Sequence, residues 1–133
     1  MKLLALIALS AVGALAQDSK LDYEFFKTKV QPIFLKKREG HARCYVCHST
    51  ATPFRLQRLS PGATTWDEEQ SRKNFKAVQY LIDPAKPEAS PLLLHPLSEE
   101  AGGDGFHSGG KHFHSREDPE WLVLREFATA KPR

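Results

Sequence analysis

The stretch Cys44-Tyr45-Val46-Cys47-His48 constrains the chain more than any other part of the sequence. It holds both cysteines of the protein, three positions apart, and a histidine follows the second directly. Side chains three apart lie on one face of a helical turn, so both thiols can reach the vinyl groups of one porphyrin. C-x-x-C-H is the pattern of c-type haem attachment. We therefore expect one covalent haem c, bound through Cys44 and Cys47, with His48 as proximal ligand to its iron.

Three other interpretations of these residues agree less well with the rest of the chain. A thioredoxin-like C-x-x-C lies near a β-α-β pattern, which is not visible here. A structural zinc site needs about four ligands, and the sequence has no second C-x-x-C. A disulfide between the two cysteines is possible in an exported protein, but it leaves His48 without a role.

The N-terminus has the pattern of a secretory signal peptide, residues 1–16. Lys2 supplies the positive charge, residues 3–15 form an apolar run, and Ala14-Leu15-Ala16 is a small-x-small cleavage site. Cleavage leaves residues 17–133, enough for one small domain. The run is short for a membrane span and no second one follows, which makes an uncleaved anchor the less favoured alternative. We expect a periplasmic or secreted protein without a stable membrane span after processing.

The charge balance of the chain bears on one class of partner, nucleic acid. The formal net charge of the 133 residues is +3, and it falls to +2 when Lys2 is removed. So small an excess argues against nucleic acid as a partner. Residues 36–40, Lys-Lys-Arg-Glu-Gly, form a charged connection. It is either a solvated turn or a surface that steers an acidic partner toward the haem edge.

Hydrophobic periodicity predicts an all-α protein of three or four helices with long loops. The first helix should run from Asp18 to about Phe34, with Asp18 or Ser19 as its N-cap and Pro32 kinking or ending it. The second should span residues 66–81, capped by Thr64 or Thr65. The last should start at Asp118-Pro119.

Two loops have a predicted role in the site. The run from Leu92 to Leu97 is too short for a long helix, and we expect it to place leucines against the core or the haem. Residues 101–111 are rich in glycine but lack a preceding strand and the Walker lysine and Ser/Thr pair, which favours a loop whose backbone lies close against a flat ligand. Near Pro53, a backbone carbonyl should accept the second ring N–H of His48.

The sequence offers several candidates for the distal iron ligand. Small cytochromes use methionine or histidine there, and the only methionine, Met1, lies in the predicted signal peptide. Because His41 is so close to Cys44, we do not expect it on the opposite face. We rank His107 first, His112 second and His95 third; the alternatives are exposed loop histidines, above all His114, and an open sixth position.

The sequence resembles monohaem c-type cytochromes, and more narrowly short secreted cytochrome-like proteins without a distal Met-Pro. The resemblance covers most of the mature chain. It rests on C-x-x-C-H together with F-x-x-x-V-x-P-I-F at residues 26–34, P-x-x-S-x-L-x-x-x-P-L at 87–97, H-x-G-G at 107–110 and Asp-Pro-Glu-Trp at 118–121. It implies a cytochrome c-like fold, thioether bonds to Cys44 and Cys47, and proximal ligation by His48.

We expect an electron carrier, not an enzyme, with redox proteins as its partners. The alternatives are a sensor or enzyme that binds a gas or peroxide at an open sixth site, and a haem-containing structural subunit of a homo-oligomer or filament.

Overall fold

The computed structural model describes residues 21–50 and 52–130. The predicted signal peptide and the predicted N-caps Asp18 and Ser19 lie outside this part of the chain. The described residues form helices, turns and loops but no β-strand, with isolated bridges pairing Arg38 with His41 and Leu97 with Phe113. This confirms the predicted all-α class.

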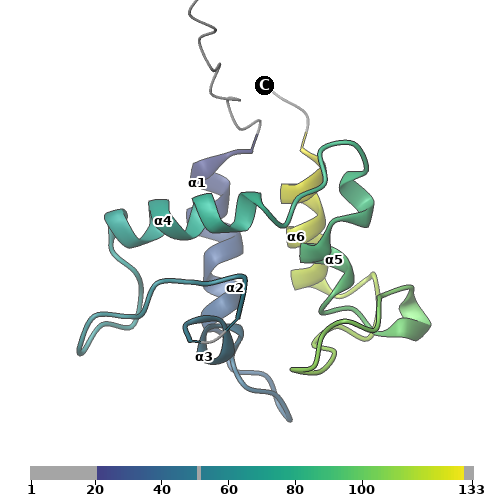
Figure 1. The fold of residues 1–133 in the computed structure, drawn as a ribbon, viewed down its shortest axis with the longest axis horizontal. Coiled ribbons are helices and arrows are strands. Elements are labelled where there is room, and N and C mark those ends of the chain that lie inside the picture. Colours follow the sequence, from purple (N-terminus) through teal and green to yellow (C-terminus); the bar gives the residue numbers. More distant parts are fainter. Residues whose placement is uncertain (1–20, 51, 131–133) are drawn as a thin grey trace, which may run out of the picture.

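Helices of very different length make up the structure (Figure 1). Their bounds are α1 Tyr23–Phe25, a π-helical segment Phe26–Val30, α2 Gln31–Leu35, α3 Cys44–His48, α4 Glu68–Gln79, α5 Pro91–Leu94 and α6 Pro119–Thr129, with 3-10 turns at Pro87–Ala89 and Glu99–Ala101. No helix within these ranges has both the length and the apolar character needed to cross a bilayer.

The first helix is continuous from Tyr23 to Leu35, although its middle is π-helical. It begins after Asp22, whose carboxylate accepts the N–H of Phe25 at 2.9 Å. Pro32 does not end it: proline is tolerated in the first turn of a helical segment, and α2 continues to Leu35 after the π-helical turn. The expectation that Pro32 ends the helix is therefore wrong.

Helix α4 starts later than its sequence suggests. Its N-cap is Asp67, which forms a reciprocal capping box with Gln70, so the predicted caps Thr64 and Thr65 are wrong. Trp66 lies before the helix and is buried, with its indole N–H donating to the carbonyl of Gln57 at 2.7 Å. The predicted start of α6 is confirmed, since Asp118 accepts the first-turn N–H groups.

The core lies where the first helix, α4, α5 and α6 meet. The rings of Phe26, Phe75 and Phe127 form a cluster with centroids 5.3–6.3 Å apart. Trp121 is fully buried and its indole N–H donates to the carbonyl of Leu93 at 3.0 Å, which joins α6 to α5. Three leucines of the predicted run, Leu92, Leu93 and Leu97, belong to this core.

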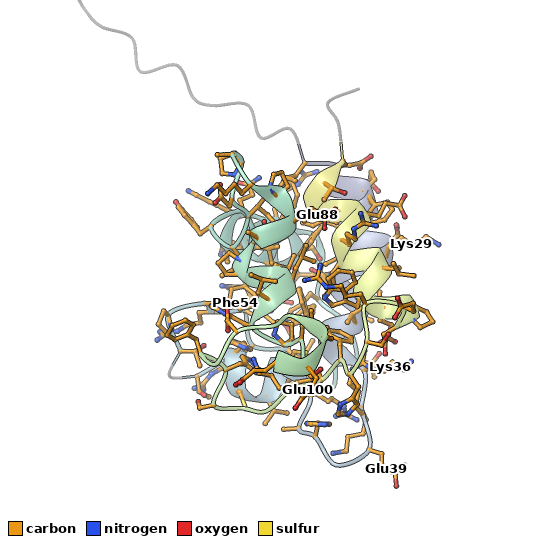
Figure 2. All side chains as sticks on the ribbon, turned by 90° about the vertical axis from the view of Figure 1, so that its right-hand side faces the viewer. Lys29, Lys36, Glu39, Phe54, Glu88 and Glu100 are labelled. Carbon is orange, nitrogen blue, oxygen red and sulfur yellow. The ribbon has the colours of Figure 1, made fainter. Side chains whose placement is uncertain are left out.

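Helix α3 lies at the foot of α2, and the loop that precedes α6 comes close to it (Figure 1). The connection between α2 and α3 extends away from the body, with Glu39 at its tip (Figure 2). The candidate site forms between α3 and the loop before α6.

Candidate haem-binding site

The two cysteines and His48 share the single helical turn α3, as predicted. Cys44 is half-buried, Cys47 is exposed, and both are free thiols. Burial raises the pKa of the Cys44 thiol. Tyr45 anchors the turn, because its ring packs edge-on against Trp66 and its hydroxyl accepts the N–H of Leu59 at 3.2 Å. Both thiols are thus presented from one short, anchored element.

Local hydrogen bonds fix the imidazole of His48. Its Nδ1 lies 3.1 Å from the carbonyl oxygen of Phe54 and 3.1 Å from the Thr52 hydroxyl. A carbonyl oxygen only accepts, so Nδ1 carries the proton and Nε2 keeps its lone pair. The predicted carbonyl acceptor is present but belongs to Phe54, not Pro53. Burial lowers the pKa of His48, which favours the neutral ring that a metal ligand requires.

The imidazole of His107, in the loop before α6, is also held by a hydrogen bond to a backbone carbonyl. Its Nδ1 lies 2.5 Å from the carbonyl oxygen of Gly110, so this ring also donates from Nδ1, and Nε2 is the nitrogen left to face a metal. Gly110 has a φ of +91°, a conformation that favours glycine. A Cβ on Gly109 would lie 3.4 Å from Cε1 of His107. The glycines therefore let the backbone fold closely around this imidazole.

The rings of His48 and His107 face each other across the site. Their centroids are 6.0 Å apart and their planes differ by 21°. Metal–imidazole nitrogen bonds are about 2 Å long, so two such bonds plus the two ring radii span a comparable distance. The donor set, two imidazoles beside two thiols, suits a covalently attached haem with one histidine on each face.

Two more histidines join this cluster. The rings of His41 and His112 lie 4.6 Å apart, and the His112 ring is 5.9 Å from that of His107 at 70°. Burial, with the neighbouring positive charges, lowers the pKa of His112 to about 4, so the ring is neutral at pH 7. The sequence had not indicated that His41 would belong to this cluster, because its neighbour in space comes from a distant loop.

The remaining candidates lie elsewhere. His95, the third-ranked distal ligand, forms a hydrogen bond with Asp104 instead, with Nδ1 and Oδ2 2.7 Å apart. His114 is exposed. In the described part of the chain, no three histidine, cysteine or acidic side chains are grouped as a metal site. The structure thus brings His48, His107 and His112 together and leaves His95 and His114 outside.

A second network supports the loop that carries His107. Lys111 donates to the carbonyl of His95 at 2.9 Å and also contacts Asp104. The N–H of Asp104 donates to the carbonyl of Leu94 at 3.1 Å. Gly103 lies so close to Leu97 that a Cβ would be 1.9 Å from its carbonyl oxygen. Gly103 thus brings two backbone segments together, whereas the approach of this loop to a flat ligand stays a prediction.

Comparison with known proteins leaves these residues as the basis for any functional inference. No family model matches the chain, and no curated protein or solved structure matches it.

Proposed function

We propose that this chain is a monohaem c-type cytochrome that transfers electrons, with haem bound to Cys44 and Cys47 and ligated by His48 and His107. One observation carries the proposal. The single C-x-x-C-H turn lies beside a second imidazole, 6.0 Å from the first, and both rings donate from Nδ1 to a backbone carbonyl. Such outer hydrogen bonds orient metal-ligating histidines and fix their tautomer.

When bound, haem iron supplies reversible one-electron exchange. The residues of the chain hold and tune it. Phe54 and Gly110 orient the two imidazoles through their carbonyl oxygens. With a histidine on each face, no coordination position is left for a substrate, which favours a carrier over an enzyme. Two histidines also give a lower potential than a Met/His pair, because thioether ligation raises it.

A cytochrome c-like fold is part of the same proposal. Its support is the all-α architecture, with the short attachment turn α3 placed between the first helix and α4 and the loop of His107 placed before α6. The packing of α6 against the first helix and α5 gives that loop a rigid base.

We propose a redox protein as the partner, bound weakly and transiently. Arg43, Arg55 and Arg58 are exposed near α3 in the sequence and take part in no ion pair within the described residues. Lys36 and Arg38, by contrast, both pair with Glu120. The free arginines are therefore the better candidates for steering an acidic partner. Export to the periplasm or cell exterior, where covalent haem is attached in bacteria, completes the proposal.

The test is the absorption and magnetic-resonance spectrum of the ferric protein, followed by exposure of the reduced protein to carbon monoxide. Bis-histidine ligation predicts a low-spin spectrum and no rapid binding of carbon monoxide. A high-spin spectrum with rapid binding would instead favour the open-site sensor or enzyme. A stable oligomer in size-exclusion chromatography would support the structural role.

A further inference from the structure

Two exposed patches of opposite charge border the candidate site, one beside each of its facing imidazoles. The basic patch consists of Arg43, Arg55 and Arg58, and the acidic patch of Glu99 and Glu100. None of these side chains takes part in an ion pair within the described residues. Unpaired opposite charges therefore lie on the two sides of one site.

The basic patch is fixed to the attachment turn α3 by the backbone. Arg55 lies between two residues whose backbone groups hydrogen-bond to His48. Arg58 precedes the residue whose N–H donates to the hydroxyl of Tyr45. Arg43 is the N-cap of α3 itself. All three exposed guanidinium groups thus branch from backbone that contacts or borders this turn.

The acidic patch belongs to the loop that carries His107. A Cβ on Gly105 would lie 3.5 Å from Oε1 of Glu99, so this carboxylate lies against the loop just before Phe106. Glu100 follows Glu99 in the same 3-10 turn. Figure 1 shows this turn on one side of α3 and the loop that precedes α4, which carries two of the arginines, on the other.

The charges are segregated along the chain in the same sense. Residues 36–66 contain six lysines or arginines and one acidic residue, whereas residues 98–106 contain three acidic residues and no lysine or arginine. Arg116 adds a cation beside the 3-10 turn, where it donates to the carbonyl of Ala101 at 2.8 Å. The turn keeps a net negative charge, because it holds two glutamates.

Each patch also exposes an apolar side chain. Phe106, directly before His107, is 84% exposed, and Val46, three residues after Arg43 on the turn of α3, is 50% exposed. Aromatic side chains at the centre of an interface contribute much of its binding energy, and charged side chains around them provide specificity. The two patches therefore have the composition of a docking surface.

We propose that this surface binds a second copy of the chain, in a weak dimer with two-fold symmetry. In such a dimer residue i of one copy contacts residue j of the other, and j contacts i. A surface with opposite charges on its two sides is complementary to itself under this operation, because the basic patch of each copy meets the acidic patch of the other.

The dimer brings the candidate sites of the two copies together, since both patches border the site. Electrons would then pass between copies, with the iron of one oxidised as the iron of the other is reduced. This exchange rests on the proposed function, whereas the association does not. The association is reversible and salt-sensitive, because exposed ion pairs contribute little free energy and are screened by salt.

Sedimentation velocity of the exported protein over a concentration series tests the association. The Debye length falls from about 30 Å at about 0.01 M salt to about 3 Å at about 1 M, so we expect dimers at the lower salt concentration and monomers at the higher. Monomers under both conditions would overturn the proposal. Species that grow beyond the dimer would overturn its two-fold symmetry.

Charge reversal tests which patches meet. Glu99→Lys/Glu100→Lys and Arg55→Glu/Arg58→Glu should each dimerise at least about tenfold more weakly than wild type. An equimolar mixture of the two variants should associate again, because each reversed patch meets an opposite charge. Lys29→Glu/Lys76→Glu is the control, since it changes the net charge as much as the arginine variant does, at exposed positions outside both patches; Figure 2 shows Lys29 well away from Glu100.

A mixture of folded variants that stays monomeric would contradict the pairing of the two patches. Phe106→Ala gives a test without a change of charge: it should weaken the dimer, whereas Tyr80→Ala, at an 81% exposed aromatic of α4, should not. Equal effects of these two variants would also overturn the proposed surface. A salt-sensitive dimer without covalent haem would refute the proposed function and leave the dimer standing.

Discussion

The imidazole rings of His48 and His107 lie 6.0 Å apart between centroids, with 21° between their planes. They come from parts of the chain that are distant in sequence, one from α3 and one from the loop before α6. Each donates its Nδ1 proton to a backbone carbonyl, so Nε2 of each ring is the nitrogen left to face a metal. The proposed ligation of haem by two histidines depends on this pairing of imidazoles.

Replacing His107 by alanine should convert the ferric haem from low-spin to high-spin and allow the reduced protein to bind carbon monoxide. The reason is that the proposed sixth ligand is removed while Cys44, Cys47 and His48 still hold the haem. His114→Ala is the matched control, because His114 is an exposed histidine of the same loop region. An unchanged low-spin spectrum in His107→Ala would transfer the distal role to another residue, with His112 the nearest imidazole.

Replacing Gly103 by alanine should lower the free energy of unfolding by about 3 kcal/mol, at the upper end of the usual cost of overpacking. The new Cβ would lie 1.9 Å from the carbonyl oxygen of Leu97, and neither backbone segment can move away easily. Urea titration followed by circular dichroism measures the effect. Gly105→Ala is the control, since its Cβ would meet only the Glu99 side chain at 3.5 Å. Equal stability of the two variants would show that the Gly103 contact is unimportant.

Much of the helical framework follows from local sequence signals. The Asp118-Pro119 start of α6 and the helical turn of C-x-x-C-H were both predictable, because caps and helix spacing act over a few residues. The start of α4 was predicted too early. Asp67 is the N-cap in place of Thr64 or Thr65, because its side chain and that of Gln70 form a reciprocal capping box.

The stability contributed by the loop that carries His107 should depend on pH, because it depends on the charge of Asp104. Burial raises the pKa of this carboxyl, but the N–H of Phe106, His95 and Lys111 outweigh it, so the pKa lies below its usual value. A carboxyl with a lowered folded-state pKa stabilises the protein above its unfolded-state pKa of about 4. That stabilisation is lost as the pH falls through the lower, folded-state value.

Asp104→Asn should therefore lower the free energy of unfolding by about 1 kcal/mol at pH 7, and by progressively less as the pH falls below about 4. Urea titrations across this pH range measure the difference from wild type. Glu100→Gln removes the same charge from an exposed side chain without an ion pair in the described residues and should have little effect. A difference that stays constant with pH would contradict the role of the ionised Asp104.

Trp121→Phe should destabilise the protein by about 1–3 kcal/mol. The buried indole N–H donates to the carbonyl of Leu93 at 3.0 Å, and phenylalanine would leave this buried acceptor unpaired. Thermal unfolding followed by circular dichroism gives the change. Leu122→Ala, at the next position of α6 but 42% exposed, is the control. A Trp121→Phe variant as stable as Leu122→Ala would contradict this account of the α5–α6 contact.

The spatial part of the site could be predicted only in outline. The position of His107 before the last helix was enough to rank it above His112 and His95 as distal ligand. The distances among these three histidines, however, depend on tertiary packing. The pairing of His41 with His112 and the inward position of Arg38 had no local signal, because their partners are distant in sequence. In the sequence Arg38 is one cation of a charged turn. Only the structure shows that Phe113 and Glu120 lie beside it.

Covalent haem attachment is tested by the intact mass of the protein after export from a bacterium with c-type haem attachment machinery. We expect a polypeptide heavier by one haem, which stays attached under denaturing conditions. The Cys44→Ala/Cys47→Ala variant should have the mass of the polypeptide alone. A wild-type protein without added mass, or a double variant that retains covalent haem, would contradict the claim.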